Sequence, residues 1–483
     1  DFSAIPLRLL GFGVLCGWHF LLLFFPIPIL ATSDLVSVLF ERQILLNLSL
    51  CIFFILFGWM LDVFSPQSKQ RSPLLLIAST CVASLASLGS LFATIYGMQA
   101  FLILSVVAMG AGEAMLMLLW LRFYSETAVN YSGRYLAASA VIGSLLCYFT
   151  RHLTTDLSLV VIVVLPIFSG IMLYLGSKHV ERRACDSAGQ GVPNWQSARK
   201  PFIKSTLQIM VFSFVLGLFQ GSTREGSELF SISDATSVLG IGIAGLCIVV
   251  LYSVAPIRPN LNIIHRVSIL LFVGGLLLVP FVSGMMANIA ATITMTGMIL
   301  LDLLILILIV DLIRTFDLKP GWVIGLNRGC EYGAFTVGIG LGFFLWGRFG
   351  HLDIFPFVLT GIAVFAVITA VLFFLNEQNI WFADSYALRK TFDEEAEKEK
   401  LGASSPLGHW RLSCSSVCDA YGLSPRESEI FYLIAKGRNA EYIQNALFIS
   451  NHTVKTHISN IYKKLEIHSA QELLDIVEHA QDE

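Results

Sequence analysis

Side chains that hydrogen-bond readily to phosphates and base edges are concentrated in one short stretch near the carboxyl end of the chain. They carry hydroxyl, amide, imidazole and ammonium groups, at Thr453, Lys455, Thr456, His457, Ser459, Asn460, Lys463 and Lys464. Between residues 436 and 464 the one acidic residue is Glu441, against five cations. Acidic residues outnumber Lys and Arg from Arg411 onward, but phosphates respond to the local charge balance. The stretch is a candidate nucleic-acid surface, and the alternative is a solvated helix face.

Two predicted helices precede this stretch. Ser424, Pro425 and Glu427 are typical of a helix start, because side-chain oxygens there accept hydrogen bonds from free amide donors. Lys436-Gly437 ends this first helix with a cation in the last turn and a glycine beyond it. A second, shorter helix is expected over residues 439–447.

Two further predicted helices carry and support the polar residues. Ser450 caps the third helix, and its polar side chains lie largely off one apolar face, which consists of Val454, Ile458, Ile461 and Leu465. Ser469 and Glu472 form a capping box that begins the fourth helix. The apolar residues of that helix are Leu473, Leu474, Ile476 and Val477.

These segments carry motifs that are specific to one class of DNA-binding domain. The motifs are Leu423-Ser424-Pro425-Arg426-Glu427, Ile449-Ser450, Thr453-Val454-Lys455-Thr456-His457 and Lys464-Leu465. On these motifs, residues 424–477 resemble the LuxR-type helix-turn-helix. The resemblance implies that the third helix enters the major groove and that the fourth mediates a homodimer on a two-fold-related DNA site.

The resemblance also assigns roles within the third helix. The side chains expected to face the bases are Lys455, Thr456 and Ser459. Those expected to contact the DNA backbone are Thr453, His457 and Lys464. The chain departs from the family pattern at Gln444, where a small alanine is usual, and at Ala470, where an arginine is usual.

Long apolar runs fill the chain before this domain. Hydrophobic residues make up 55% of the sequence, with 36 Phe, and charged residues only 13%, which is typical of a polytopic membrane protein. We predict an all-α fold in which a membrane bundle of twelve helices precedes a small four-helix domain. The predicted spans are residues 5–30, 44–63, 73–95, 99–121, 134–150, 157–176, 203–222, 232–254, 264–286, 289–313, 322–346 and 354–375.

The distribution of Lys and Arg between the loops predicts the orientation of the chain. With a cytoplasmic amino terminus, the inner loops hold Lys69, Arg71, Arg122, Arg134, Lys178, Arg182, Arg183, Arg199, Lys200, Lys204, Arg258, Arg266, Arg314 and Lys319. The outer loops then hold Arg42, Arg151, Arg224 and Arg348. Cytoplasmic loops of membrane proteins carry the excess of Lys and Arg. Both termini are therefore expected in the cytoplasm, with the bundle in the lipid of the cytoplasmic (inner) membrane.

The predicted spans fall into two halves, residues 1–176 and 203–376, separated by a central loop at 177–202. This layout resembles the major facilitator superfamily, which implies two six-helix bundles around a central cavity. Gly58-Trp59-Met60-Leu61-Asp62, with Lys69 and Arg71 downstream, keeps part of that family's signature. The Gly-Arg pair that should follow is missing.

Four ionisable residues within apolar spans are candidates for a ligand site. They are Glu113, Asp302, Arg328 and Glu331, and His19 is a further titratable residue in the first span. Charges inside the membrane are costly and usually face a cavity or a partner. The alternative is structural pairing, since Arg328 and Glu331 are three residues apart on one helix. For Asp311 beside Arg314 we favour the structural interpretation.

The sequence gives little support for catalysis or for a bound cofactor. It contains no nucleotide-binding glycine loop, no catalytic triad and no phospho-accepting receiver domain. Cys414 and Cys418, with His409 upstream, lack a second ligand pair, so a metal or redox site is the less favoured interpretation. We expect no enzyme activity, no metal and no cofactor.

The predicted domains suggest a sensor joined to a DNA-binding domain. A membrane domain at 1–376 is followed by a charged and flexible linker at 377–408 and by the reader domain, residues 409–483. The favoured hypothesis is a one-component transcriptional regulator that senses an unknown small molecule and controls DNA binding. The alternatives are a secondary transporter with an appended regulatory domain, and a membrane anchor without a ligand.

The charge bias makes a testable prediction of topology. Single cysteines placed near Glu41 and near Glu225 should react with a membrane-impermeant reagent in intact cells, whereas cysteines at either terminus should react only after lysis. Labelling of the 177–202 loop from outside would overturn the twelve-span topology.

Overall fold

The computed structural model describes two units, and every regular element within the described residues is a helix. The described residues are 10–24, 35–64, 73–126, 129–179, 195–222, 234–254, 261–282, 284–316, 318–375, 414, 417–418, 420–423, 425–440, 442–443 and 451–482. The first unit covers Asp1–Phe374 and the second covers Leu375–Glu483.

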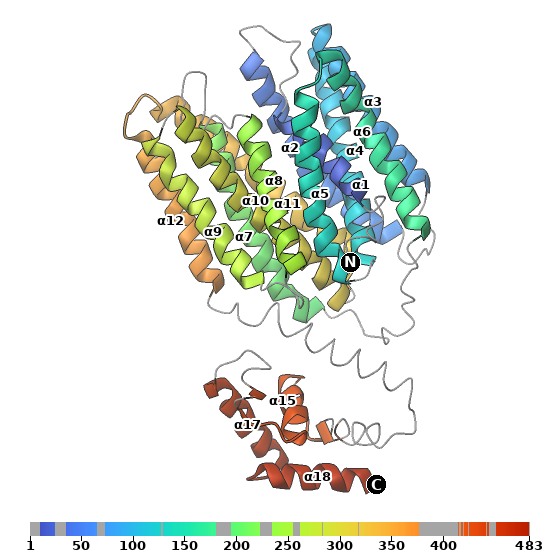
Figure 1. The fold of residues 1–483 in the computed structure, drawn as a ribbon, viewed down its shortest axis with the longest axis vertical. Coiled ribbons are helices and arrows are strands. Elements are labelled where there is room, and N and C mark those ends of the chain that lie inside the picture. Colours follow the sequence, from blue (N-terminus) through green and yellow to red (C-terminus); the bar gives the residue numbers. More distant parts are fainter. Residues whose placement is uncertain are drawn as a thin grey trace. The chain divides into compact units, whose positions relative to one another are not determined.

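The first unit is a bundle of long helices (Figure 1). Its first half contains α1 (Gly11–Phe24), α2 (Leu35–Phe64), α3 (Pro73–Ile95), α4 (Gln99–Glu126), α5 (Val129–Arg151) and α6 (Thr155–His179). Its second half contains α7 (Trp195–Gly221), α8 (Asp234–Val254), α9 (Leu261–Leu278), the short 3-10 helix η4 (Val279–Phe281), α10 (Gly284–Thr315), α11 (Pro320–Phe349) and α12 (Phe355–Leu375).

Many of these helices have the composition of membrane spans. Within the described residues, eight are long and apolar enough to cross a membrane, and α1 and α8 contribute shorter apolar segments. The sixth predicted span is among the eight, as Asp156–Ser177. The α5 and α11 helices are not among the eight; α5 contains Arg134, and α11 contains Arg328 and Glu331. The count of twelve spans therefore stays a prediction.

Glycines allow α11 to approach its neighbours closely. A Cβ on Gly58 of α2 would lie 2.4 Å from the carbonyl oxygen of Gly321, and one on Gly325 would lie 2.4 Å from that of Phe54. Further along α11, a Cβ on Gly342 would lie 2.1 Å from the carbonyl oxygen of Leu218 on α7. Small residues permit such backbone contact between membrane helices. The α11 helix is thus packed against α2 of the first half and α7 of its own half.

Polar groups join the two halves at one end of the bundle. The Asp62 carboxylate, near the end of α2, accepts hydrogen bonds from the backbone N–H groups of Gly321 (3.0 Å) and Trp322 (2.5 Å) at the start of α11. A carboxylate at a helix N-terminus satisfies free donors and interacts favourably with the helix dipole. Arg314 of α10 donates to the carbonyl oxygen of Ser125 on α4 (2.9 Å).

A third polar link lies at the same end. Arg134, near the start of α5, donates to the carbonyl oxygen of Tyr252 near the end of α8 (3.0 Å). Chain direction places these three links together, because α2, α4, α8 and α10 end there and α5 and α11 begin there. This is also the end at which α12 finishes.

The second unit has its own apolar core. Its described helices are α15 (Pro425–Ala435), α17 (Asn451–Leu465) and α18 (Ala470–Asp482). Buried core residues include Cys414, Cys418, Ile430, Phe431, Ile434, Ile443, Val454, Ile461, Leu465, Leu473 and Val477. Most of the second expected helix, with Gln444, lies outside the described residues, as do the caps Ser424 and Ser450.

The expected capping interactions are present at two helix ends. Ser469 Oγ accepts from the N–H of Glu472 (3.2 Å), and the Glu472 carboxylate accepts from Ser469 Oγ (2.8 Å) and from the N–H of His468 (2.9 Å). After α15, Gly437 adopts the left-handed conformation at φ 71°. The N–H of Arg438 then reaches the carbonyl oxygen of Leu433 (3.0 Å), which closes the helix end.

After α17 the same kind of helix ending is formed without a glycine. Glu466 has φ 57°, and the N–H of Ile467 bonds to the carbonyl oxygen of Tyr462 at 3.0 Å. The left-handed region is unfavourable for residues that carry a Cβ. Glu466 is thus a strained position in the reader domain.

We predict that Glu466→Gly stabilises the isolated reader domain by about 1 kcal/mol, because glycine removes the Cβ clash at the left-handed position. Urea unfolding followed by circular dichroism measures this. Glu466→Ala is the control, because it removes the charge but keeps the Cβ; equal stabilisation by both variants would assign the effect to charge.

Candidate ligand cavity and reader domain

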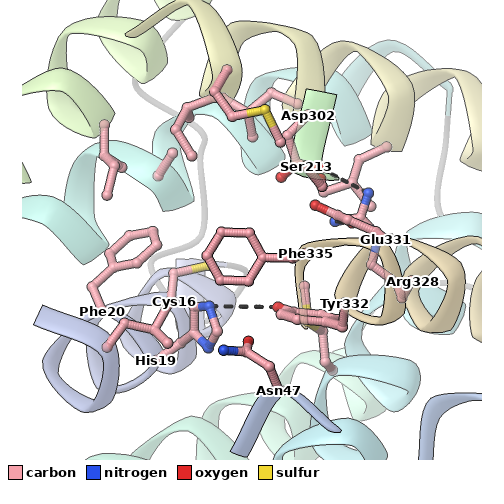
Figure 2. A pocket seen from close by; sticks show the side chains of 18 of the residues that line it. Cys16, His19, Phe20, Asn47, Ser213, Asp302, Arg328, Glu331, Tyr332 and Phe335 are labelled. Atoms are coloured by element: carbon pink, nitrogen blue, oxygen red, sulfur yellow. Dashed lines mark hydrogen bonds and ion pairs between the residues drawn. The ribbon is translucent and has the colours of Figure 1, made fainter. Parts of the chain in front are cut away.

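A cavity of about 150 Å³ lies between the two halves of the first unit. Its walls come from α1, α2, α4, α5, α7, α8, α10 and α11 (Figure 2). All four residues that the sequence singled out line it, namely Glu113, Asp302, Arg328 and Glu331. Their positions span residues 113 to 331, so only the fold brings them together.

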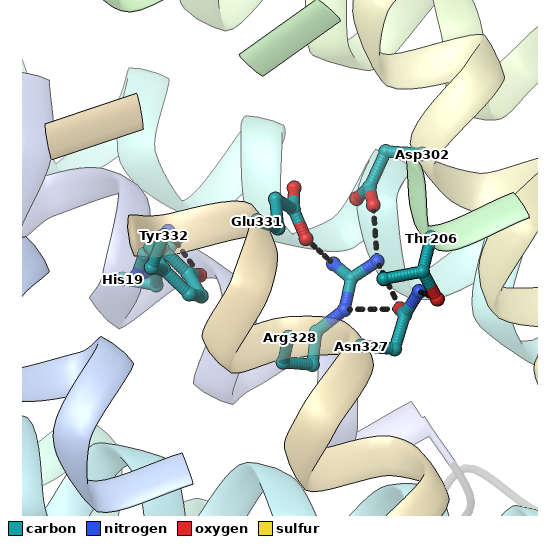
Figure 3. Close-up of polar contacts among 7 residues, drawn as sticks. All are labelled: His19, Thr206, Asp302, Asn327, Arg328, Glu331 and Tyr332. Carbon is teal, nitrogen blue, oxygen red and sulfur yellow. Dashed lines mark hydrogen bonds and ion pairs between the residues drawn. The ribbon is translucent and has the colours of Figure 1, made fainter. Parts of the chain in front are cut away.

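Arg328 is the centre of one polar cluster. Its side chain is only 2% exposed, and its two terminal nitrogens lie 2.7 Å from Asp302 Oδ1 and 2.7 Å from Glu331 Oε2 (Figure 3). Its guanidinium also donates to Asn327 Oδ1, whose amide nitrogen in turn donates to Thr206 Oγ1 at 3.1 Å. Both carboxylate-binding edges of the guanidinium are therefore occupied.

His19 and Glu113 form a second cluster. The Nδ1 atom of His19 on α1 contacts the Glu113 carboxylate on α4. The hydroxyl of Tyr332 lies 3.5 Å from His19 Nε2, and Tyr332 follows Glu331 on α11. The two clusters are thus adjacent along α11, and together they include residues from both halves of the bundle.

Apart from Asp302 Oδ1 and Glu331 Oε2, which are ion-paired with Arg328, three buried polar atoms on the cavity wall make no hydrogen bond within the described part of the chain. They are Glu113 Oε2, Asn47 Oδ1 and Ser213 Oγ, on side chains that are each at most 2% exposed. A buried polar group without a partner is costly. Groups of this kind on a cavity wall are suited to hold a polar ligand.

Several wall residues were not identified from the sequence. Asn47, Ser213, Tyr332, Gln43 and Gln220 carry no formal charge, so nothing in an apolar span distinguishes them from structural polar residues. Gln220 of α7 donates to Gln43 Oε1 of α2 at 2.9 Å, which is a further contact between the halves. The one signal for His19 was its titratable ring in the first span.

The polar residues of the second unit lie on α17. Lys455, Thr456, Ser459, Asn460, Lys463 and Lys464 are exposed, whereas Thr453 and His457 are half-buried. Lys464 Nζ lies 2.7 Å from Glu427 Oε2 and donates to the carbonyl oxygen of Gly422 at 3.0 Å. Lys464 therefore also fastens α17 to the start of α15, a role that the sequence did not indicate.

The two cysteines of the reader domain are core residues. Cys414 and Cys418 are both buried, and burial raises the pKa of Cys414 to about 12. The thiol is thus protonated at neutral pH and is a poor metal ligand or nucleophile. His409 lies outside the described residues, within which no group of three or more His, Cys, Asp or Glu side chains is placed to hold a metal ion.

Residues 422–477 match the bacterial regulatory proteins of the luxR family. The uncharacterized response regulatory protein YgeK of Escherichia coli is 43% identical over 67 residues, which are 13% of this chain and 46% of that protein. The transcriptional regulatory protein LiaR of Bacillus subtilis is 38% identical over 81 residues, 17% of this chain and 38% of that protein. The chain thus spans less than half the length of these relatives.

The first unit is similar in fold to solved membrane transporters. A bacterial homologue of the iron transporter ferroportin has a TM-score of 0.53 at 13% identity, over 76% of this chain and 96% of that structure. The proton:xylose symporter XylE, a major facilitator superfamily protein, has a TM-score of 0.52 at 13% identity, over 77% of this chain and 94% of that structure. These matches are to regulators and transporters rather than enzymes. The chain therefore joins a helical unit similar in fold to these transporters to a domain whose residues 422–477 match the luxR family.

Proposed function

We propose that the protein is a membrane-embedded, one-component transcriptional regulator. The observation that supports this most strongly is a cavity with buried, incompletely paired charges, in a chain that also carries a luxR-family domain. A small molecule held in the cavity would control whether the reader domain binds DNA.

The cavity offers a physical basis for sensing. Its walls come from both halves, and the polar links of Asp62, Arg134 and Arg314 hold the halves together at one end. A ligand shifts a conformational equilibrium only by its difference in affinity for the two states. A ligand that pairs with the cavity charges in one arrangement of the halves favours that arrangement, and the arrangement then determines how readily two tethered reader domains meet.

The reader domain would bind DNA as a homodimer through α17. Its exposed Lys455, Thr456 and Ser459 would face base edges, and Thr453, His457 and Lys464 would contact phosphates. Asn460 and Lys463 would extend this surface. The position of α17 above a compact apolar core supports this assignment, because the core holds the helix at a fixed angle.

DNA in a cell is reached from the cytoplasm, so the proposed function requires a particular topology. Twelve spans with both termini cytoplasmic place the reader domain on the correct side of the cytoplasmic membrane. The excess of Lys and Arg in the predicted inner loops supports this orientation.

The alternative function is secondary transport, with the reader domain regulating expression. The fold similarity to a ferroportin homologue and to XylE favours it. Uptake of a labelled ligand by counterflow in proteoliposomes separates the two functions, because a sensor binds its ligand without exchanging it across the membrane.

The DNA assignment predicts different effects for two lysines. Lys455→Ala should weaken binding to a selected operator by about 1–3 kcal/mol and relax sequence preference, because a base contact is lost. Lys464→Ala should weaken binding to all DNA sequences alike, because a phosphate contact acts through counterion release. It should also reduce the slope of log affinity against log salt concentration by about 1.

Gel-shift titration of the isolated reader domain, with operators selected from random duplexes, measures both effects. Lys436→Ala is the matched control, since it removes the same charge beyond the end of α15. The Lys464 variant also loses its pair with Glu427, so its fold is checked by urea unfolding. Normal operator affinity in both lysine variants would contradict the assignment.

The sensing assignment predicts that cavity variants uncouple the response. Glu113→Gln or Arg328→Ala should abolish the transcriptional response or fix it on or off, while the operator affinity of the isolated reader domain stays the same. Reporter expression across candidate metabolites measures the response, and Asp156→Asn on the exposed start of α6 is the control. Variants that respond like the parent would show that the sensing site lies elsewhere.

A further inference from the structure

The cavity wall carries more negative than positive charge. Its described lining contains three carboxylates, Glu113, Asp302 and Glu331, and one permanently charged cation, Arg328. Arg328 neutralises one carboxylate, which leaves a formal charge of −2, or −1 when His19 is protonated. Uncompensated charge away from water is costly, so the cavity favours an occupant of opposite sign.

The unpartnered atoms of the wall are hydrogen-bond acceptors. Glu113 Oε2 and Asn47 Oδ1 accept only, and Ser213 Oγ accepts as well as donates. The amide nitrogen of Asn47 already donates to the carbonyl oxygen of Gln43 at 2.8 Å, which fixes its oxygen as the free end. A ligand that matches this wall must therefore bring donors.

The same wall is unsuited to an anion. The two ends of the Arg328 guanidinium each face a carboxylate at 2.7 Å, so an anionic ligand would have to displace one of them. A divalent metal is not favoured either, because the described residues contain no cluster of three or more metal-ligating side chains.

The rest of the cavity is apolar and small. Aromatic rings of Phe12, Phe20, Tyr332 and Phe335 contribute to the wall, and Figure 2 shows the Phe335 ring pointing into the space among the polar groups. Aromatic faces attract organic cations. A cavity of about 150 Å³ is large enough for a benzene ring, which sets the size of the ligand.

We propose that the cavity binds a small organic cation, a protonated amine with an apolar body no larger than about one ring. Its ammonium group supplies both the positive charge and the donors that Glu113, Asn47 and Ser213 lack. The body packs against the aromatic side chains. This inference rests on the proposed function in one respect, namely that the bound amine is the molecule sensed.

Three probes that differ only in their polar group test the ligand class. The purified full chain in detergent is titrated by calorimetry with benzylamine, benzyl alcohol and benzoate. We expect benzylamine to bind more tightly than benzyl alcohol by a factor of about ten or greater, and benzoate to bind most weakly of the three. Equal or tighter binding of benzoate, or no binding of benzylamine, overturns the proposal without any variant.

Substitutions then locate the site. Glu113→Gln should reduce benzylamine affinity roughly tenfold to a hundredfold, the range for losing a hydrogen bond to a charged group. Asp302→Asn should reduce it as well, because the cavity wall becomes less negative. Asp156→Asn, which removes a carboxylate from the exposed start of α6, should leave it unchanged. Unchanged affinity in both cavity variants overturns the proposed site.

A DNA-binding measurement distinguishes an error in the proposed ligand class from an error in the proposed regulator function. Operator affinity of the full chain is measured with and without saturating benzylamine, and reporter expression is measured with all three probes. If benzylamine binds but changes neither readout, the amine site stands and the proposed regulator function is contradicted. If the reporter responds to benzoate and Arg328→Ala loses that response, the regulator function stands and the proposed amine ligand is contradicted.

Discussion

The cost of burying charge within the membrane domain is the constraint on which the arrangement of its helices depends. Arg328 is almost fully enclosed, and it is tolerable there because Asp302 of α10 and Glu331 of α11 both lie 2.7 Å away. The contact between His19 and Glu113 joins α1 to α4 for the same reason. The Arg328–Asp302 and His19–Glu113 contacts each constrain the rotation of two helices about their axes, so these charges help to define which faces meet at the cavity.

The contacts between the halves differ in kind along the bundle. At one end α2 and α11 touch through glycine backbones, and the Asp62 carboxylate accepts from the first N–H groups of α11. Near the cavity the halves are also joined by side-chain contacts, such as that of Gln220 with Gln43, and some polar atoms there are unpartnered. Backbone contacts and satisfied hydrogen bonds resist separation, whereas unpartnered polar atoms gain from a ligand. In the proposed function, this difference would allow a small molecule to bias the arrangement of the two bundles.

The reader domain follows local rules to a greater extent than the membrane domain. Its helix periodicity, the capping box at Ser469 and Glu472, and the glycine ending at Gly437 were all predictable from the sequence, and the structure confirms them. Glu466 was not identified, because its left-handed conformation follows from the way Ile467 returns to the core. The pair of Lys464 with Glu427 was also missed, since the two residues are 37 positions apart and on different helices.

The sequence alone determined that most of the chain is apolar helix, that ionisable residues at 113, 302, 328 and 331 are out of place in such helices, and that a helix-turn-helix follows. Those features are local, because hydrophobic runs, caps and motifs act over one or two helical turns. Only the tertiary structure decided that these four residues share one cavity, that His19 partners Glu113 across 94 positions, and that Asn47 and Ser213 join them. Such pairings are set by how helices rotate and pack, and packing depends on all the neighbouring faces at once, which no local pattern encodes.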